Sequence, residues 1–183
     1  MKLILIGMPG SGKSTQGNLL SKELNIPYLS TGDIFRTLSK EPTPTGRYIK
    51  EIIDKGSLIP DDKTIQIVTE YLSRSDYKDG YILDGFPRTS IQAMNFKDNI
   101  DYVLYLSIDD VESLNRLLKR QDKLRQDDTV NTIKKRIEIF HKQTQPVLDF
   151  YKPKGLLQIV DGSKSIEGIH QVIIDILKNI HEI

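Results

Sequence analysis

A glycine-rich segment near the N-terminus carries the clearest chemical signal in the sequence. Residues 7–14 read Gly-Met-Pro-Gly-Ser-Gly-Lys-Ser and match the pattern GxxxxGK[ST] at every specified position. Glycines let such a loop curl so that its N–H groups point at phosphate oxygens, and the helix that follows adds partial positive charge. Lys13 supplies a mobile full charge, and the hydroxyls of Ser14 and Thr15 are candidate contacts for Mg²⁺ and phosphate. The segment predicts a nucleoside triphosphate site made of Gly10, Ser11, Gly12, Lys13, Ser14 and Thr15.

The loop alone does not distinguish among enzymes that bind nucleoside triphosphates. A GTPase reads guanine with an Asn-Lys-x-Asp segment, and the nearest candidate, residues 95–98, reads Asn-Phe-Lys-Asp and lacks the pattern. A glycine-rich turn without a ligand is the competing interpretation. Gly-Lys-Ser at the start of a helix, however, serves no packing need, so we expect a nucleotide site and disfavour a GTPase.

Two aspartates are candidates for contact with a Mg²⁺ ion that accompanies the triphosphate. Asp84 ends an apolar strand, and a carboxylate at the carboxyl edge of a parallel sheet can hold a water of the Mg²⁺ shell. An aspartate that only caps the next turn is the alternative at this position. Asp33 has weaker support, because an N-cap role for a helix that starts near Ile34 accounts for it equally well.

Short apolar runs alternate with longer helix-like segments along the chain. We expect strands at 3–6, 27–29, 81–83, 102–106 and 158–160. We expect helices at 13–24, 61–73, 90–96, 110–119, 129–151 and 166–180. This alternation predicts an α/β fold: three α/β/α layers around a five-stranded parallel sheet that is covered on both faces.

Two stretches depart from the alternation and are predicted to be additions to the sheet. Residues 30–59 have helical character but no strand, and they include a stiff turn at 41–46, which reads Glu-Pro-Thr-Pro-Thr-Gly. Residues 121–127 are polar and lie between two predicted helices. Such additions often move in α/β enzymes.

Composition limits the remaining classes. The chain has 183 residues with 38% hydrophobic and 28% charged residues, enough for one compact domain with a solvated surface. The net charge of +1 gives no general attraction to nucleic acid or to an anionic membrane. The absence of cysteine excludes disulfides and thiolate metal sites. The first apolar run is too short for a secretion signal, and no segment approaches a membrane span, so we expect a cytoplasmic protein.

Taken in order, the polar segments strongly resemble the adenylate kinase family over essentially the whole chain. The resemblance lies in GMPGSGKSTQ, YLSTGDIFR, GSLIPD, DGFPRT, RQDD followed by KKRI, and VDGSK. It implies a single kinase domain over 1–183 that catalyses ATP + AMP = 2 ADP with Mg²⁺ and serves nucleotide homeostasis. It also implies an AMP-binding subdomain at 30–59, a short lid at 121–127, and a monomer. Zinc is not expected, because the four-cysteine site of some long-lid members is absent.

The resemblance also implies roles for individual residues. Six of the eight arginines fall on motif positions of the family, a sorting that a random solvated surface would not produce: Arg36, Arg88, Arg116, Arg120, Arg125 and Arg136. Arg36 and Arg88 would hold the AMP phosphate. Arg116 would lie against the ATP base and Arg120 would contact ATP phosphate. Arg125 and Arg136 would neutralise charge on the transferring group and on AMP. The catalytic set is thus Lys13, Arg88, Arg120, Arg125 and Arg136, and Arg47 and Arg74 are interpreted as surface residues.

Residues other than the arginines would make most contacts to the adenine bases of ATP and AMP. By the same resemblance, Gln92 would hydrogen-bond the adenine of AMP, and the backbone of Lys164 would contact the adenine of ATP. The rest of the AMP site would comprise Thr31, Ser57, Leu58, Ile59, Gly85, Phe86 and Pro87.

Two alternatives stay open on the sequence. A UMP/CMP kinase has the same fold and chemistry, but such relatives usually carry Ala in place of Thr31 and Asn in place of Thr89. A non-catalytic nucleotide-binding module is disfavoured because Lys13 and Arg88 are both present. No general base is needed, since the AMP phosphate is already an ionised nucleophile, and the three histidines are interpreted as surface or structural. The loop 121–124 lacks glycine and is predicted to cover less of ATP than a usual lid.

Overall fold

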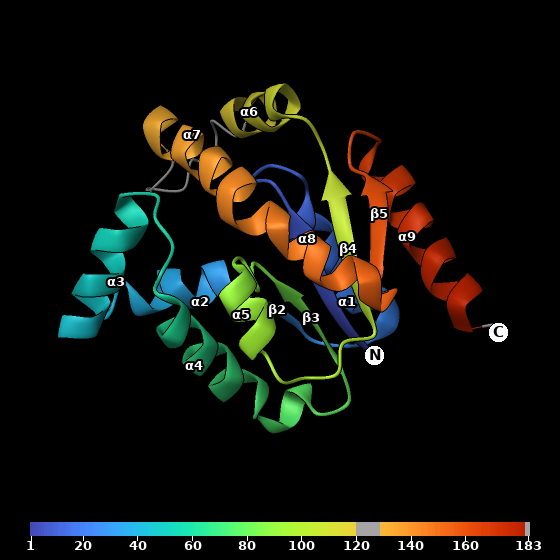
Figure 1. Ribbon diagram of the computed structural model, residues 1–183, viewed down its shortest axis with the longest axis horizontal. Coiled ribbons are helices and arrows are strands. Elements are labelled where there is room, and N and C mark those ends of the chain that lie inside the picture. The colour runs from blue at the N-terminus through green and yellow to red at the C-terminus, as the bar shows by residue number, and fades with distance from the viewer. Residues whose placement is uncertain (120–128, 182–183) are drawn as a thin grey trace.

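A five-stranded, entirely parallel sheet forms the centre of the protein (Figure 1). The computed structural model describes residues 1–119 and 129–181, without the side chains of Ile180 and His181. The sheet order is β2-β3-β1-β4-β5. The strands are β1 (Lys2–Gly7), β2 (Tyr28–Ser30), β3 (Tyr81–Asp84), β4 (Tyr102–Ser107) and β5 (Leu157–Asp161). All five predicted strands are therefore present, with boundaries that differ by one residue or so, and the predicted α/β class is confirmed.

Alternate residues of the strands enter two separate hydrophobic cores. On β1, Ile4 and Ile6 pack into one core, whereas Leu3 and Leu5 pack into the other. Successive side chains of a strand point to opposite faces of its sheet, so a strand that is apolar at every position must be covered on both faces. This is why the strand segments read as continuous apolar runs.

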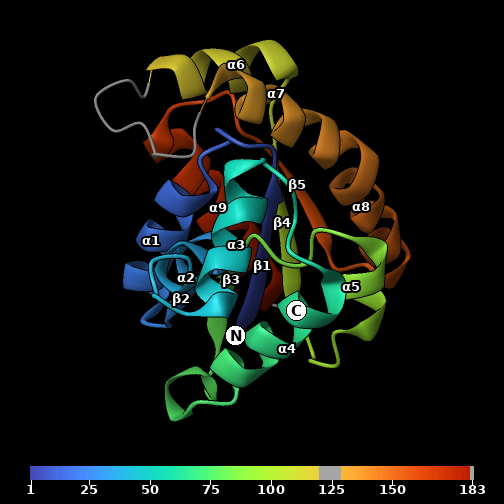
Figure 2. The ribbon, with the colours of Figure 1, turned by 90° about the vertical axis from the view of Figure 1, so that its left-hand side faces the viewer.

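Helices cover the two faces in two layers (Figure 2). Helices α1 (Lys13–Leu24) and α9 (Ile166–His181) lie on one face and supply Leu20 and Ile173 to its core. The opposite face is covered by α4 (Asp61–Leu72), α5 (Ser90–Asn95), α7 (Val130–Ile139) and α8 (Gln145–Tyr151). Helix α6 (Asp110–Lys119) and two short 3₁₀ turns, η1 (Ser75–Tyr77) and η4 (Lys152–Lys154), complete these elements.

Residues 31–59 form a helical region beside the sheet, whereas Ser30, the first residue of the predicted addition, is the last residue of β2. The region contains α2 (Thr31–Leu38) and α3 (Pro44–Asp54), with a small core of Phe35, Ile49 and Ile59. Two local predictions were wrong. The Ser30 hydroxyl, not Asp33, caps α2 by accepting the Asp33 N–H at 3.3 Å. The predicted turn at 41–46 ends early, because Thr43 caps a helix that Pro44 begins; proline suits a first helical turn, where no intrahelical N–H is needed.

The predicted helix 129–151 is interrupted. A π-helical segment, η3 (Phe140–Thr144), separates α7 from α8. Pro146 lies in the first turn of α8 and cannot donate a backbone hydrogen bond, so the regular i→i−4 ladder cannot run unbroken through this point. The helix prediction missed this change because apolar periodicity continues across it.

Some predictions lie outside the described residues. These are the lid at 121–127 with its loop 121–124, and the arginines Arg120 and Arg125. In the part of the chain that the structure describes, no helix combines the length and the apolar character needed to cross a membrane.

Candidate active site

In a parallel sheet with this strand order, a ligand is expected at the carboxyl end of the central strand β1. From β1 the chain crosses to β2 and β3 on one side, and later to β4 and β5 on the other side. Such a reversal of strand order opens a crevice at the carboxyl ends of the strands. The glycine-rich loop 7–14 follows β1 and Asp84 ends the adjacent β3, so the two strongest sequence signals meet at this point.

The glycine-rich loop has the backbone geometry that its pattern predicts. Gly10 and Gly12 have φ values of 81° and 92°, a left-handed region that side chains disfavour, and Gly12 is the N-cap of α1. The ammonium group of Lys13 lies across the loop and donates to the carbonyls of Gly7 at 2.8 Å and Met8 at 2.9 Å. These two bonds hold the loop in a curled form at the N-terminus of α1, a helix of twelve residues.

Helix α6 braces the tip of the loop. The buried Ser113 hydroxyl donates to the Pro9 carbonyl at 2.6 Å. A Cβ on Gly10 would lie 3.0 Å from the Ser113 carbonyl oxygen, so the helix and the loop approach closely. On the same helix the Arg116 guanidinium donates to Glu112 at 2.6 Å. Arg116 is therefore near the loop but is held along its own helix.

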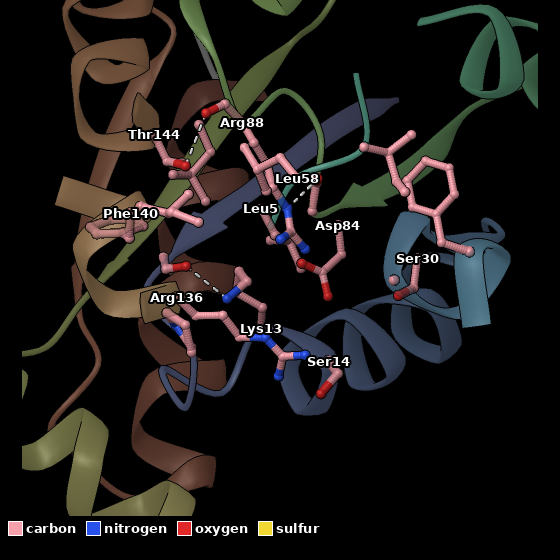
Figure 3. Close-up of a pocket in the computed structure, with 18 of the residues that line it drawn as sticks. Leu5, Lys13, Ser14, Ser30, Leu58, Asp84, Arg88, Arg136, Phe140 and Thr144 are labelled. Atoms are coloured by element: carbon pink, nitrogen blue, oxygen red, sulfur yellow. Dashed lines mark hydrogen bonds between the residues drawn. The ribbon is translucent and has the colours of Figure 1, made fainter. Parts of the chain in front are cut away.

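Asp84 lies at the centre of the crevice (Figure 3). Its side chain is buried, with the residue only 7% exposed, and its Oδ2 accepts a hydrogen bond from the Tyr28 hydroxyl at 2.6 Å. Its Oδ1 is also buried and has no hydrogen-bond partner among the residues that the structure describes. Burial, with a smaller contribution from the Asp84 charge, raises the pKa of Tyr28 above its ordinary value of 10.0, so the hydroxyl keeps its proton and donates.

Arg88 is fixed by its backbone and side chain together. Its Nε donates to the Gly85 carbonyl at 2.8 Å, and its own carbonyl accepts the Thr144 hydroxyl at 2.9 Å (Figure 3). A Cβ on Gly85 would lie 3.0 Å from the Arg88 guanidinium and 2.6 Å from the Thr31 hydroxyl. Gly85 thus leaves the room that the guanidinium occupies beside the crevice. The adjoining Phe86–Pro87 peptide bond is cis.

The Gln92 amide has a defined orientation. Its Oε1 accepts the Arg88 backbone N–H at 2.7 Å, and its Nε2 donates to Asp61 Oδ1 at 2.8 Å. A backbone N–H can only donate and an ionised carboxylate can only accept. The Arg88 N–H must therefore face the amide oxygen of Gln92, and the Asp61 carboxylate must face the amide nitrogen. Thr89 donates to the same Asp61 oxygen at 2.9 Å. These two bonds to described residues use one of the two N–H groups and one of the two lone pairs of the Gln92 amide, and Gln92 is among the residues that line the crevice.

The helical region 30–59 forms the opposite wall. Arg36 on α2 lines the crevice and donates to Asp33, so Asp33 is a partner of an arginine there. At the other end of the region the Ser57 hydroxyl accepts the Lys135 ammonium at 2.8 Å. This bond joins the wall to α7, the helix that also carries Arg136 into the crevice.

Much of the predicted site is brought together in one crevice. The predicted residues that line it are Gly10, Gly12, Lys13, Ser14, Arg36, Ser57, Leu58, Ile59, Asp84, Gly85, Pro87, Arg88, Gln92 and Arg136. Its charged lining residues in the described part of the chain are four cations, Lys13, Arg36, Arg88 and Arg136, and one carboxylate, Asp84. An excess of positive charge of this kind suits polyphosphate ligands.

Other predicted residues do not line the crevice. Ser11, Thr31 and Phe86 are buried, and they support the walls rather than face the opening. Thr15, Asp33, Arg116 and Lys164 are not among the lining residues either, and Lys164 is exposed in the loop after β5. The Thr31 hydroxyl donates to the backbone carbonyl of Asp84 at 3.2 Å, so Thr31 helps to hold the backbone of the residue that is the candidate Mg²⁺ contact.

Several lining residues were missed by the sequence analysis. They are mostly apolar or small: Ser30, Gly32, Phe35, Ile53, Thr64, Leu117, Ile139, Phe140 and Thr144. Phe140 and Thr144 follow Arg136 at steps of four residues, so projecting one helix face from Arg136 would have found them. The inward faces of α2 and α3 carry no comparable signal, because any core residue has the same character.

His141 is outside the crevice. Hydrogen bonds with Gln145 at 2.8 Å and with Asp110 at 2.7 Å raise its pKa above the ordinary value of 6.5. Since Asp110 begins α6, the imidazole links that helix to the π-helical segment. This contact fits the predicted structural role.

The residues at the carboxyl edge fit a hydrated Mg²⁺ ion. Among the described residues, no three Asp, Glu or His side chains gather into a cage for a directly bound metal. Mg²⁺ in nucleotide enzymes keeps several waters and takes few protein ligands, so one buried carboxylate oxygen without a partner is a suitable water acceptor. Ser14 is among the residues that line the same crevice.

Comparison with known proteins decides the family. The family model for adenylate kinase matches residues 5–156, which is most of the chain. The chain belongs to the adenylate kinase family. Adenylate kinases of known name agree along nearly the whole length. One from Bacillus subtilis (strain 168) is 39% identical, covering 97% of this chain and 98% of the relative. One from Clostridium novyi (strain NT) is 38% identical, covering 94% and 96%, and one from Staphylococcus aureus (strain Mu50) is 38% identical, covering 98% and 100%.

Membership in the adenylate kinase family establishes the class of reaction. The chain is a nucleoside monophosphate kinase, a phosphotransferase whose nucleotides are ATP, AMP and ADP. The alignment with the Bacillus subtilis relative extends over 212 positions, more than the 183 residues of this chain. That adenylate kinase therefore contains residues that this chain lacks.

Proposed function

We propose that the crevice binds ATP and AMP end to end and transfers the γ-phosphoryl group of ATP in line onto the AMP phosphate. The observation that carries this proposal is the meeting of Lys13, Arg88 and Arg136 around one crevice that Asp84 also enters. These groups come from the loop after β1, the loop after β3 and helix α7, so only the folded chain assembles them. Four cations converge where two anionic nucleotides must approach each other.

ATP is expected on the glycine-rich loop. The loop and the N-terminus of α1 offer backbone N–H groups to its phosphates, and Lys13 adds a full charge. In the structure the ammonium of Lys13 bonds to carbonyls of its own loop, a place from which it can turn to a phosphate oxygen. Lys164 and Arg116 remain proposed contacts of the ATP base, with Arg120 on ATP phosphate.

Mg²⁺ is the proposed cofactor. Asp84, with Ser14 beside the phosphates, would hold its hydration shell, and the ion would supply charge neutralisation between the phosphate groups. The buried Oδ1 of Asp84, which has no hydrogen-bond partner among the residues that the structure describes, supports this role. Zinc is not proposed.

AMP is expected against the wall formed by residues 30–59, the proposed AMP-binding subdomain. Arg36 and Arg88 would hold its phosphate as planar forks, with Arg136 and the undescribed Arg125 on the side of the transferring group. No side chain needs to act as a base, because the attacking phosphate oxygen is already ionised. The protein contributes positioning and cations matched to the charge in flight.

The base of AMP is expected near Gln92 and the backbone of 57–59. The apolar lining residues Phe35, Ile53 and Ile59 offer a surface for a planar base, and the Gln92 amide offers one donor and one acceptor. Adenine presents a donor and an acceptor side by side on its Watson–Crick edge. A fixed amide beside an apolar pocket is suited to that edge.

An acceptor assay tests the proposal most directly. Purified protein with ATP and Mg²⁺ is given AMP, UMP, CMP or GMP, and ADP formation is followed by a coupled assay. We expect rapid ADP formation with AMP and much slower reaction with the other three. Equal or faster reaction with UMP or CMP would favour the alternative kinase of the same fold and contradict the proposed base site.

The short lid, the monomeric state and a cytoplasmic location remain predictions. The lid segment 121–127 lies outside the described residues, and the extra length of the relatives is consistent with a shortened segment here. Size-exclusion chromatography with light scattering tests the monomer, for which we expect a mass near 20.9 kDa.

A further inference from the structure

The side chain of Tyr28 connects the edge strand β2 to Asp84 on the neighbouring strand. Tyr28 lies opposite Ile82 in the parallel register, and Asp84 is two residues further along β3. Residues two apart on a strand point to the same face, so the tyrosine ring and the carboxylate share the face that α1 covers. The hydroxyl reaches across this diagonal and donates to Asp84 Oδ2 at 2.6 Å.

Gly17 provides the room for this ring. It lies within α1, where glycine costs about 1 kcal/mol relative to alanine in a helix interior. A Cβ at this position would lie 2.2 Å from Cε2 and 2.6 Å from Cδ2 of Tyr28. The glycine therefore has a packing reason, and that reason is the tyrosine that contacts Asp84.

The two oxygens of the Asp84 carboxylate are in different situations. Oδ2 is occupied by Tyr28, and Oδ1 is buried and has no partner among the described residues. The terminal torsion of an aspartate is broad, so the side chain by itself leaves the rotation of its carboxylate plane loosely defined. The hydrogen bond from Tyr28 to one carboxylate oxygen fixes that rotation and thereby the direction in which the other oxygen points.

We propose that Tyr28 is a positioning residue that holds the Asp84 carboxylate with Oδ1 toward the hydration shell of the nucleotide-bound metal. Gly17 admits the ring that makes this contact. The inference rests on the proposed metal role of Asp84 and adds to it a residue outside the crevice lining. A tyrosine that only tied β2 to β3 would affect stability and leave metal binding unchanged.

The test compares two tyrosines that make the same bond at opposite ends of β3. Tyr28→Phe removes the donor to Asp84, and Tyr81→Phe removes the hydroxyl that donates to Asp98, also at 2.6 Å. Mn²⁺ replaces Mg²⁺ as an observable ion, and the dissociation constant of Mn·ATP is measured by electron paramagnetic resonance without AMP, so that no turnover occurs. The dissociation constant of metal-free ATP is measured in parallel.

We expect Tyr28→Phe to weaken Mn·ATP binding about tenfold and to leave metal-free ATP unchanged, since the loss of a residue that orients a metal ligand typically costs tenfold or more. Tyr81→Phe should change neither constant. Unchanged Mn·ATP binding in Tyr28→Phe would overturn the inference. An equal loss in Tyr81→Phe would also overturn it, because the effect would then be general.

The variant Asp84→Asn distinguishes the positioning role of Tyr28 from the metal role of Asp84 on which it rests. If Asp84→Asn binds Mn·ATP as the unaltered protein does, the metal role of Asp84 is wrong and the inference falls with it. If Asp84→Asn loses affinity and Tyr28→Phe does not, only the inference is wrong.

The role of Gly17 has its own readout. We expect Gly17→Ala to lower the thermal midpoint when Tyr28 is present, since the methyl group would overlap the ring. In a Tyr28→Ser background the same change should raise the midpoint, because alanine is the better helix former. A decrease of equal size in both backgrounds would contradict the proposed fit between glycine and ring.

Discussion

The two ends of strand β3 carry aspartate sites that share one contact and differ in the rest. At the carboxyl end, Asp84 accepts the Tyr28 hydroxyl on Oδ2, and its buried Oδ1 has no partner among the described residues. At the amino end, the Tyr81 hydroxyl donates to Asp98 Oδ2 at 2.6 Å, and the Lys2 ammonium donates to Oδ1 at 2.6 Å. Both oxygens of Asp98 are thus paired.

The difference between these sites distinguishes structure from function. A buried polar atom without a partner costs about 1–3 kcal/mol, so a fold maintained only for stability would pair Asp84 as fully as Asp98. Exceptions of this kind are expected where a ligand supplies the missing partner. The comparison predicts that changes near Asp84 lower activity, whereas changes near Asp98 lower stability.

The largest expected effect is on turnover at the Asp84 end. Arg88→Ala removes a guanidinium that lines the crevice, and we expect kcat to fall by roughly 10³-fold, as for other arginines that contact a transferring phosphoryl group. The fold should remain intact, as judged by circular dichroism and the thermal midpoint. Arg74→Ala is the control, since its exposed guanidinium stacks on the Tyr71 ring and does not line the crevice. Normal turnover in Arg88→Ala would remove the proposed role.

A smaller effect on activity is expected at Gln92, an uncharged residue of the crevice. Gln92 resembles Asp84 in being buried, with 1% exposure, and its amide has hydrogen-bonding capacity beyond the two bonds that it makes to Arg88 and Asp61 in the described part of the chain. Gln92→Leu should lower kcat/KM for AMP by about a hundredfold, because a site that loses its polar contacts to a substrate discriminates poorly. The KM for ATP should hardly change.

A matched control for this variant is Gln171→Leu, whose amide donates to Asp175 at 2.8 Å on the exposed side of α9. It should leave both substrate constants unchanged. An equal rise in the KM values for ATP and AMP in Gln92→Leu would indicate a general disturbance, and the proposed contact with the AMP base would be wrong.

The third effect belongs to the amino end of β3. Asp98→Asn weakens the bonds to Lys2 and Tyr81, and we expect the free energy of unfolding at pH 7 to fall by about 1–2 kcal/mol. Turnover should stay at the level of the unaltered protein. Asp54→Asn, which breaks an exposed pair with Lys50, should cost less than about 0.5 kcal/mol. Loss of turnover in Asp98→Asn without loss of stability would reverse the comparison.

The sequence predicted the sheet because both faces of its strands are buried. Continuous apolar runs such as those of β1 and β4 are typical of strands in a covered parallel sheet, and Lys13 follows the first of them within a recognisable loop. Segments whose form depends on neighbours were harder. The interruption at Phe140–Thr144 comes just before Pro146, and Phe140 in it stacks on Tyr105 of β4. The proline is visible in the sequence, whereas the ring contact depends on the fold.

The sequence predicted the site residues that are charged and belong to a recognisable motif. It missed uncharged residues that take part only through the way they pack. Lys13, Asp84, Arg88 and Arg136 were found, and the structure brings them to one crevice. Tyr28 reads as an ordinary strand residue, since its contact with Asp84 depends on the pairing of β2 with β3. Strand pairing follows from long-range topology, which local periodicity does not encode.

The smallest expected effect is a difference in pH dependence between the unaltered protein and Asp98→Asn. Burial opposes ionisation of Asp98, but hydrogen bonds from Lys2 and Tyr81 outweigh it and hold the pKa of this carboxyl below its ordinary value of 3.8. A pKa lowered by folding contributes stability that is fully present above 3.8 and is lost as the pH falls through the folded value. Urea unfolding at a series of pH values should therefore show the difference in unfolding free energy between the two proteins becoming smaller below about pH 4. Because the side chain is 26% exposed, the part of the difference that depends on pH should stay below about 1 kcal/mol. If the difference in unfolding free energy instead grows as the pH falls, the ionised form of Asp98 destabilises the fold. Asp98 would then not be the carboxylate whose hydrogen bonds stabilise its charge, and the contrast with Asp84 would be wrong.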